Sequence, residues 1–174
     1  SVYNGELNAG GLFTIAGSTP SNNIAKWNGT TWTALGTGLP PTVVLALAVY
    51  NGELYVGGQF TTAGGNPANY IAKWNGTSWS SVGNGFNAQP QALKVYNGEL
   101  YAGGQFSTAD GNPANYIAKW NGTNWTSVGS GVDSRVEALA LMGNNLYAGG
   151  FFNNAGVNPA NYVAQLNGST WSAL

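Results

Sequence analysis

The chain alternates short runs of apolar residues with tight turns. In its second quarter, the run Ala46–Tyr50 is followed by Asn51-Gly52 and then by a second run, Glu53–Gly58. An Asn-Gly pair between two short apolar runs is a strong hairpin signal, because a type I′ turn needs positive φ at both central residues. No segment shows the 3.6-residue period of an amphipathic helix, so the pattern predicts β-strands.

The same pattern continues after a loop at about Thr61–Asn69. A third run, Tyr70–Trp74, and a fourth, Thr77–Val82, flank a second Asn-Gly pair. Together the four runs predict a four-stranded antiparallel meander. A two-residue second turn would place Trp74 opposite Thr77, and Ala72 opposite Trp79.

This meander recurs along the whole chain. Leu54–Gly83 and Leu100–Gly129 are identical at 25 of 30 positions, and looser copies span Leu7–Gly36 and Leu146–Leu174. Four-stranded meanders repeated every ~40–50 residues are typical of β-propeller blades. The sequence therefore predicts an all-β fold, a β-propeller built of four-stranded antiparallel blades. A linear β-solenoid is the alternative, but its repeats are shorter and lack two hairpins per unit.

The blades give the domain organisation. We expect one propeller domain, or a propeller segment, over residues 1–174, with four repeats of about 46 residues at approximately 1–45, 46–91, 92–137 and 138–174. Four blades is the low end for propellers. We therefore expect either a part of a larger ring or self-association, such as two chains forming eight blades. A closed four-bladed monomer is the second choice.

Two features of every repeat carry a resemblance to a known family. A glycine doublet ends the second run and a tryptophan lies in the fourth: Gly10-Gly11, Gly57-Gly58, Gly103-Gly104 and Gly149-Gly150, with Trp32, Trp79, Trp125 and Trp171. This order resembles the kelch repeat of galactose-oxidase-like propellers. The unit also resembles AKWNG(T/S)xW repeats of secreted bacterial proteins. The resemblance implies glycines with a backbone conformation that other residues resist, and tryptophans packed between blades rather than exposed as sugar platforms.

Composition narrows the function classes. Only 11 of the 174 residues are charged and the net charge is −1, so no basic patch exists for nucleic acid. No apolar run approaches the ~20 residues that cross a membrane, so we expect no membrane insertion. Neutral Asn, Gly, Thr and Ser replace Lys and Glu at the surface. This composition favours a secreted or cell-surface protein.

The residue types argue against catalysis. Histidine and cysteine are absent, which removes imidazole bases, thiolate nucleophiles and ordinary zinc or copper sites. No position of this chain matches the histidines and the cysteine that a galactose-oxidase-like copper site would need. Asp110 and Asp133 are isolated loop acids without a calcium-binding motif. We therefore predict no enzyme, no catalytic residue, no metal and no cofactor.

The remaining acids repeat with the blades. Glu6, Glu53 and Glu99 share one repeat position, and Lys26, Lys73 and Lys119 share another. In the fourth repeat both charges are lost together, to Asn145 and Gln165. We predict that each Glu meets a Lys near the turns and that these pairs are structural.

Loop lengths indicate a binding face. The strand 1–2 and 3–4 turns lie at one end of a meander, and the longer strand 2–3 and inter-blade loops lie at the other. We predict a non-catalytic binding module for glycans or another protein on this looped face. Its candidate binding residues are Gln59, Asn66, Asn69, Gln105, Asn112, Asn115, Asn158 and Asn161. The alternatives are that these side chains only hold the loops, and that the chain is a structural or assembly repeat without a small ligand.

Overall fold

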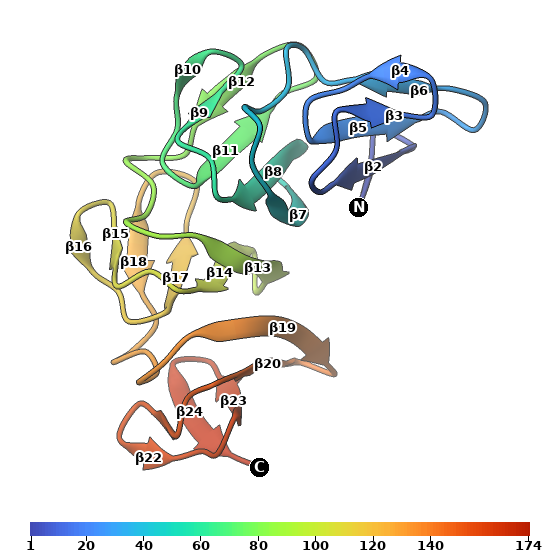
Figure 1. Cartoon of the computed structure of the whole chain (residues 1–174). Helices are drawn as coiled ribbons and strands as arrows, with labels where there is room; N and C mark the ends of the chain where they lie inside the picture. The colour runs from blue at the N-terminus through green and yellow to red at the C-terminus, as the bar shows by residue number, and fades with distance from the viewer. The chain divides into compact units, whose positions relative to one another are not determined.

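The computed structural model describes all 174 residues and is built only of strands and connections (Figure 1). It contains four four-stranded antiparallel sheets, one in each repeat, and four two-stranded hairpins. The chain divides into two compact units, Ser1–Val82 and Gly83–Leu174, each with two repeats. The all-β prediction and the four repeated meanders are confirmed. No helix is long and apolar enough to cross a membrane.

The first unit holds twelve strands. In chain order they are β1 (Val2–Tyr3), β2 (Glu6–Gly10), β3 (Ile15–Ala16), β4 (Thr19–Pro20), β5 (Ile24–Trp27), β6 (Trp32–Ala34), β7 (Val44–Tyr50), β8 (Glu53–Gly58), β9 (Thr62–Ala63), β10 (Asn66–Pro67), β11 (Ile71–Trp74) and β12 (Trp79–Ser81). Its two large sheets have the orders β1-β2-β5-β6 and β7-β8-β11-β12.

The second unit repeats this arrangement. Its strands are β13 (Pro90–Tyr96), β14 (Glu99–Gly104), β15 (Thr108–Ala109), β16 (Asn112–Pro113), β17 (Ile117–Trp120), β18 (Trp125–Ser127), β19 (Val136–Met142), β20 (Asn145–Gly150), β21 (Asn154–Ala155), β22 (Asn158–Pro159), β23 (Val163–Asn167) and β24 (Thr170–Ala173). The sheet orders are β13-β14-β17-β18 and β19-β20-β23-β24.

The two Asn-Gly pairs of a repeat form different turns. Asn51 and Gly52 have φ values of 49° and 75°, which confirms the predicted type I′ turn between β7 and β8. At the second pair the predicted register is wrong, because Trp74 lies opposite Trp79 rather than Thr77. The side-chain oxygen of Asn75 accepts hydrogen bonds from the backbone N–H groups of Thr77 and the residue after it, and these bonds hold a longer turn.

The strand 2–3 loop is more ordered than the sequence predicts. In the second repeat it contains the hairpin β9–β10, in which Ala63 pairs with Asn66, and the hairpin contacts strand β12 (Figure 1). The third strand then begins at Ile71, one residue later than expected, because Tyr70 has a left-handed φ of 64°. The loop is thus a small folded element that covers the edge strand of its own sheet.

The second glycine of the doublet is required for space in the second, third and fourth repeats, which corrects the expected conformational role. None of the doublet glycines has positive φ. A Cβ at Gly58 would instead fall on the carbonyl oxygen of Val43, and a Cβ at Gly150 would fall on that of Arg135. The first strand of the repeat bulges at this point, between Val44 and Ala46 in the second repeat. The bulge brings backbone against backbone, where only glycine fits.

Each unit has one hydrophobic core that joins its two repeats. In the first unit, Ile24 and Leu35 of the first repeat pack with Leu54, Trp74 and Trp79 of the second. All five side chains are buried. In the second unit the corresponding core includes Ile117, Val128, Leu146, Leu166 and Trp171. The cores therefore lie between sheets, as expected for blades that pack face to face.

Candidate functional site

One small hollow recurs at the junction of the two repeats in each unit. In the first unit it has a volume of about 250 Å³. It is lined by residues of the connection after β6, the β9–β10 hairpin and the turn before β12: Gly36, Thr37, Gly64, Asn66, Trp74, Thr77, Ser78 and Trp79. We call this set and its counterpart below the recurring hollow.

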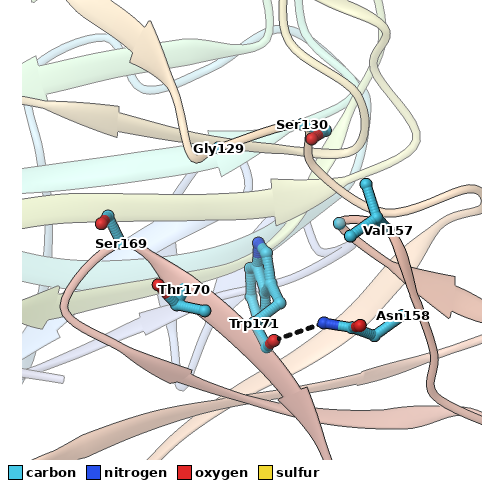
Figure 2. A pocket seen from close by; sticks show the side chains of 8 residues that line it. Gly129, Ser130, Val157, Asn158, Ser169, Thr170 and Trp171 are labelled. Atoms are coloured by element: carbon cyan, nitrogen blue, oxygen red, sulfur yellow. Dashed lines mark hydrogen bonds between the residues drawn. The ribbon is translucent and has the colours of Figure 1, made fainter.

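The second unit carries the counterpart, with a volume of about 150 Å³ (Figure 2). It is lined by residues that, except for Val157, occupy repeat positions of the first hollow: Gly129, Ser130, Gly156, Val157, Asn158, Ser169, Thr170 and Trp171. Figure 2 shows Trp171 in the middle of this group, with Ser169 and Thr170 on one side and Asn158 on the other. Glycines, hydroxyl residues, the asparagine and the fourth-strand tryptophan recur; Leu166 replaces Trp74 in the sequence.

The fourth-strand tryptophan fixes the floor of each hollow. The indole nitrogen of Trp79 donates to the carbonyl oxygen of Leu35 at 3.0 Å, and that of Trp171 donates to the carbonyl oxygen of Val128 at 3.3 Å. Trp79 is 6% exposed and Trp171 is 3% exposed. These tryptophans join adjacent repeats, as the resemblance implied, and they do not form exposed platforms.

In the first unit, two glycines let the walls approach the rings of Trp74 and Trp79. Gly64 has a φ of 59°, and a Cβ there would lie 2.8 Å from Cδ1 of Trp79. Gly36 also has positive φ, and a Cβ there would lie 3.2 Å from Cη2 of Trp74. Larger residues at either position would fill the hollow and strain the backbone.

The rim of the hollow is polar but uncharged. The first unit contributes the hydroxyls of Thr37, Thr77 and Ser78 and the amide of Asn66. No residue that lines either hollow carries a formal charge. Such a site can exchange neutral hydrogen bonds above an apolar floor, and its lining contains no carboxylate, imidazole or thiol.

The structure separates the asparagines of the predicted binding face. Asn66 and Asn158 line the two hollows, and Nδ2 of Asn158 donates to the backbone oxygen of Trp171 at 3.0 Å (Figure 2). Asn112, at the same repeat position, donates weakly to the carbonyl oxygen of Asp110 at 3.5 Å. Asn115 holds the next connection through a 3.2 Å bond to the carbonyl oxygen of Ser130. For Asn115, this contact agrees with the alternative that the candidate side chains only hold the loops.

The other predicted residues lie outside the hollow. Asn69 and Asn161 are exposed. Gln59 is exposed and Gln105 is half-buried, and each follows a glycine doublet. The backbone N–H of Gln59 donates to the carbonyl oxygen of Val43 at 2.9 Å, so this residue pairs with the chain just before β7. These positions remain predictions for a broader looped face.

The predicted Glu–Lys pairs form in the first three repeats. Nζ of Lys73 lies 2.8 Å from Oε2 of Glu53, and the pairs in the first and third repeats measure 2.7 Å and 2.9 Å. Their side chains are about one quarter to one third exposed. In the fourth repeat the hydroxyl of Tyr147 donates to Oε1 of Gln165 at 3.1 Å instead. The pairs lie across adjacent strands and are framework contacts.

The two loop acids hold connections. Asp110 accepts hydrogen bonds from the backbone N–H groups of Asn84 (2.6 Å) and Trp125 (2.8 Å). Asp133 accepts from the backbone N–H groups of Asn153 and Asn154 and from the side-chain amide of Asn154. The hydrogen bonds from Asn154 hold the pKa of Asp133 below its usual value. No group of three or more His, Cys, Asp or Glu residues is gathered as for a metal ion.

One buried tyrosine has an altered acidity. Tyr101, on β14, is 2% exposed. Burial, followed by the nearby carboxylate of Glu99 and by Tyr96, raises the pKa of Tyr101 to about 12. The rings of Tyr96 and Tyr101 lie 5.5 Å apart, edge to face. The effect arises in the sheet interior and does not mark a reactive site.

Sequence reasoning missed most of the hollow. The pattern places Thr77 and Ser78 in a strand and Gly64 in a loop without a specific role. The usable signal is the periodicity itself, because small, hydroxyl and amide residues recur at fixed distances from the fourth-strand tryptophan. What the sequence does not supply is the neighbouring repeat, which brings Gly36 and Thr37 to the same place.

The repeated sheets and the packing between them define a propeller-like repeat domain. The family described as "Domain of unknown function (DUF5122) beta-propeller" matches residues 51–76, within the second repeat. Among solved structures, the computationally designed Ika8 protein is similar over 84% of this chain and 40% of that chain, with a TM-score of 0.54. The identity is 17%, so the likeness concerns the fold alone. No curated protein sequence matches the chain.

Proposed function

We propose that the repeats are blades of a β-propeller and that the chain is a non-catalytic module that binds neutral glycans at the recurring hollow. The observation that carries this proposal is the lining, which combines a tryptophan floor with hydroxyl and amide groups and contains no charge. A sugar ring presents the matching chemistry, because its C–H faces are apolar and its hydroxyls exchange hydrogen bonds with neutral groups.

The size of the hollow limits what it holds. Volumes of about 150 and 250 Å³ lie below the roughly 300–1,000 Å³ of pockets that bury a drug-sized ligand. One ring or a chain end fits better than a whole oligosaccharide. We expect weak binding at each site and a gain from repetition, because linked sites raise the effective concentration of a multivalent ligand.

The carboxylates support a role without catalysis. Three of the six acids pair with lysines, and Glu137 pairs with Arg135 at 2.8 Å. The two aspartates accept backbone N–H groups. A glycosidase would need two acids facing a common space at ~5–9.5 Å, and no acid lines either hollow. The neutral composition further supports a secreted or cell-surface location.

Glycan-array binding followed by titration of the best soluble ligand tests this proposal. We expect saturable binding to neutral glycans and a change in tryptophan fluorescence, since Trp79 and Trp171 form the floors. The double variant Asn66→Ala/Asn158→Ala should weaken binding at least tenfold. The matched control is Asn161→Ala, because this exposed asparagine belongs to the same loop motif and does not line a hollow.

Two results would overturn the proposal. One is the absence of any binding by the folded protein on the array. The other is binding that Asn161→Ala weakens as much as the hollow variant does, which would move the site to the broader looped face. An assembly role without a small ligand is the second candidate, and it is favoured by large apolar side chains that remain exposed in loops, such as Leu12 and Val157.

A further inference from the structure

The third repeat has a carboxylate at a position where the two hollows have glycine. Asp110, in the turn of the β15–β16 hairpin, takes the repeat position of Gly64 and Gly156. Its Oδ1 accepts the backbone N–H of Asn84 at 2.6 Å, and its Oδ2 accepts the backbone N–H of Trp125 at 2.8 Å. One carboxylate therefore takes two backbone donors, one from the connection before the hairpin and one from the fourth strand.

The residues that correspond to these two donors line both hollows. The pairs are Thr37 with Trp79 in the first hollow and Ser130 with Trp171 in the second. Thr37 and Ser130 come from the connection, and the tryptophans come from the fourth strand. We call the four backbone N–H groups of these residues the hollow donors.

The connection has the same backbone conformation in all three places. The glycine before the donor has a φ of 59° at Gly36, 58° at Gly83 and 57° at Gly129. The glycine after the donor has φ values of 73°, 72° and 75° in the same order. Backbone N–H groups beside left-handed residues form concave nests that bind anions. The connection therefore directs its N–H in each hollow as it does toward Asp110.

The hairpin also contacts the connection in the same way. The backbone N–H of Asp110 donates to the carbonyl oxygen of Gly85 at 2.9 Å. The corresponding bonds of Gly64 and Gly156 measure 3.0 and 2.8 Å. The left-handed φ is shared as well, at 52°, 59° and 62°. Because glycine has no side chain, each hollow is open where the Asp110 carboxylate lies in the third repeat.

The N–H of the fourth-strand tryptophan faces the same space. In the second repeat, the backbone N–H of Asn75 donates to the carbonyl oxygen of Ser78, one step before Trp79 in the ladder. Bonded and non-bonded pairs alternate in an antiparallel ladder, so the N–H of Trp79 points away from β11 and toward the hairpin that contacts β12. In the fourth repeat, the carbonyl oxygen of Trp171 accepts Nδ2 of Asn158, so the backbone polar groups of this tryptophan also face the hairpin.

We propose that each recurring hollow binds a carboxylate group of a ligand through its two hollow donors. Asp110 shows this contact within the same chain, with one oxygen on each donor. Hydrogen bonds to an ionised oxygen are about twice as strong as neutral ones, and no acid lines either hollow to repel the ligand. The inference adds a charged group to the proposed ligand chemistry and holds without a sugar ring. A uronic acid would use both the indole floor and the donors.

Amide resonances of the 174-residue chain report on these donors directly. In proton–nitrogen correlation spectra, sodium acetate up to about 100 mM should move the hollow donors downfield and saturably, with sodium chloride at equal ionic strength as the reference. The amides of Asn84 and Trp125 are the internal control. They should not move, because Asp110 already bonds them.

Three ligands distinguish the possible sources of the carboxylate. A response of the hollow donors to acetate shows that the carboxylate alone suffices. A response to glucuronate but not to acetate shows that the carboxylate binds as part of an acidic sugar. Either outcome supports the inference. Equal responses to glucose and glucuronate would overturn it, because glucose has no carboxylate.

A substitution in the second hollow tests the geometry. In Gly156→Asp, the introduced carboxylate should take both donors, so acetate should no longer move them while the donors of the first hollow still respond. A Cβ at Gly156 would lie 3.6 Å from Cδ1 of Trp171, an ordinary contact, and aspartate tolerates a left-handed φ. The matched control is Asn161→Asp, which adds the same charge at an exposed residue that does not line the hollow. It should leave the response unchanged.

The reverse substitution tests the third repeat. Asp110→Gly removes the carboxylate and keeps a residue that adopts the left-handed φ. The amides of Asn84 and Trp125 should then begin to respond to acetate. Circular dichroism establishes that each variant is folded, and the wild-type titration decides the inference without any variant.

Three results would overturn the inference. The first is an acetate response of the hollow donors that is no larger than the chloride response. The second is a folded Gly156→Asp variant whose second hollow still responds as the wild type does. The third is a folded Asp110→Gly variant whose Asn84 and Trp125 amides stay silent. Binding of neutral glycans on the array can succeed or fail whatever acetate does, so the inference and the proposed function fail separately.

Discussion

The indole nitrogen of Trp79 donates a 3.0 Å hydrogen bond to the carbonyl oxygen of Leu35, which lies 44 residues earlier in the chain. This bond joins the fourth strand of one repeat to the end of the preceding repeat. Trp171 makes the same bond to Val128 in the second unit. One side chain therefore ties two repeats together and forms the floor of the recurring hollow.

We predict that Trp79→Phe destabilises the first unit. The change removes a buried donor and leaves the carbonyl of Leu35 unsatisfied, which costs about 1–3 kcal/mol. Urea denaturation followed by circular dichroism measures the loss. Ser80→Ala, at the exposed neighbour on the same strand, should stay within about 0.5 kcal/mol. Equal effects of the two substitutions would show that the hydrogen bond contributes little.

We predict a large difference between two equivalent glycines. Gly58→Ala would press its Cβ onto the carbonyl oxygen of Val43, so it should destabilise by about 1–3 kcal/mol or more. Gly11→Ala, at the same position of the first repeat, meets only the ring of Phe13 at 3.5 Å. That variant should be neutral or stabilised by up to about 1 kcal/mol. Thermal denaturation of both proteins checks the contrast, and similar losses would contradict the close approach.

We predict an acid-dependent contribution from Asp133. Its folded pKa is lowered by hydrogen bonds from Asn154, so its stabilisation is present above the unfolded pKa and disappears as the pH falls through the folded pKa. Asp133→Asn should be less stable at neutral pH, because a single amide oxygen cannot replace both carboxylate oxygens. The difference should narrow as the pH falls below about 4, the unfolded value of an aspartate. The urea midpoints of the wild type and of Asp133→Asn, measured from neutral pH to below about pH 4, give this difference.

The connection around Asn87 provides a natural reference for that experiment. Asn87 occupies the position of Asp133, and its side-chain oxygen accepts the backbone N–H groups of Ser107 and Thr108 at 2.9 and 3.0 Å. The amide should therefore keep the two backbone contacts of Asp133, and Asp133→Asn should still fold. A difference between variant and wild type that is constant over the whole pH range would refute the titration of Asp133.

We predict that Tyr101 ionises at a higher pH than an ordinary tyrosine. Burial and Glu99 raise its pKa to about 12, whereas an unfolded tyrosine has a value of about 10. The neutral phenol is favoured in the folded state, so its stabilisation is complete below the unfolded pKa and is lost as the pH rises toward the folded pKa. Tyrosine ionisation is followed by ultraviolet absorbance as the pH is raised, for the wild type and for Tyr101→Phe. Subtracting the second curve from the first gives the titration of Tyr101. A difference curve centred near the unfolded value would contradict the prediction.

We predict a small coupling between Glu53 and Lys73. The two side chains are 26% and 28% exposed, and such pairs contribute about 0.2–1 kcal/mol. A double-mutant cycle with Glu53→Asn and Lys73→Gln measures the coupling and copies the residue types of the fourth repeat. High salt should reduce it. A coupling above about 2 kcal/mol would mean that the pair is more than a surface contact.

The sequence by itself determined the strands, the four repeats and the local pairs. Asn51-Gly52 specifies its turn through backbone φ, which needs no distant partner. Glu53 and Lys73 meet because antiparallel neighbours bring their repeat positions together. The predicted register of the second Asn-Gly turn is wrong because the side chain of Asn75 also accepts hydrogen bonds, although the Thr and Ser that donate to it are visible in the sequence.

Only the tertiary structure decided what each repeated residue does. Trp32 and Trp79 have similar local sequence contexts, yet Trp79 is buried and Trp32 is half-exposed, because only Trp79 has a preceding repeat packed on it within the unit. Gly58 and Gly11 differ for a similar reason, since a Cβ would fall on the carbonyl oxygen of Val43 at Gly58 but would meet only the ring of Phe13 at Gly11. The recurring hollow also requires two repeats, because its walls come from both. Burial and cavities depend on which surfaces meet, and a period along the chain does not contain that information.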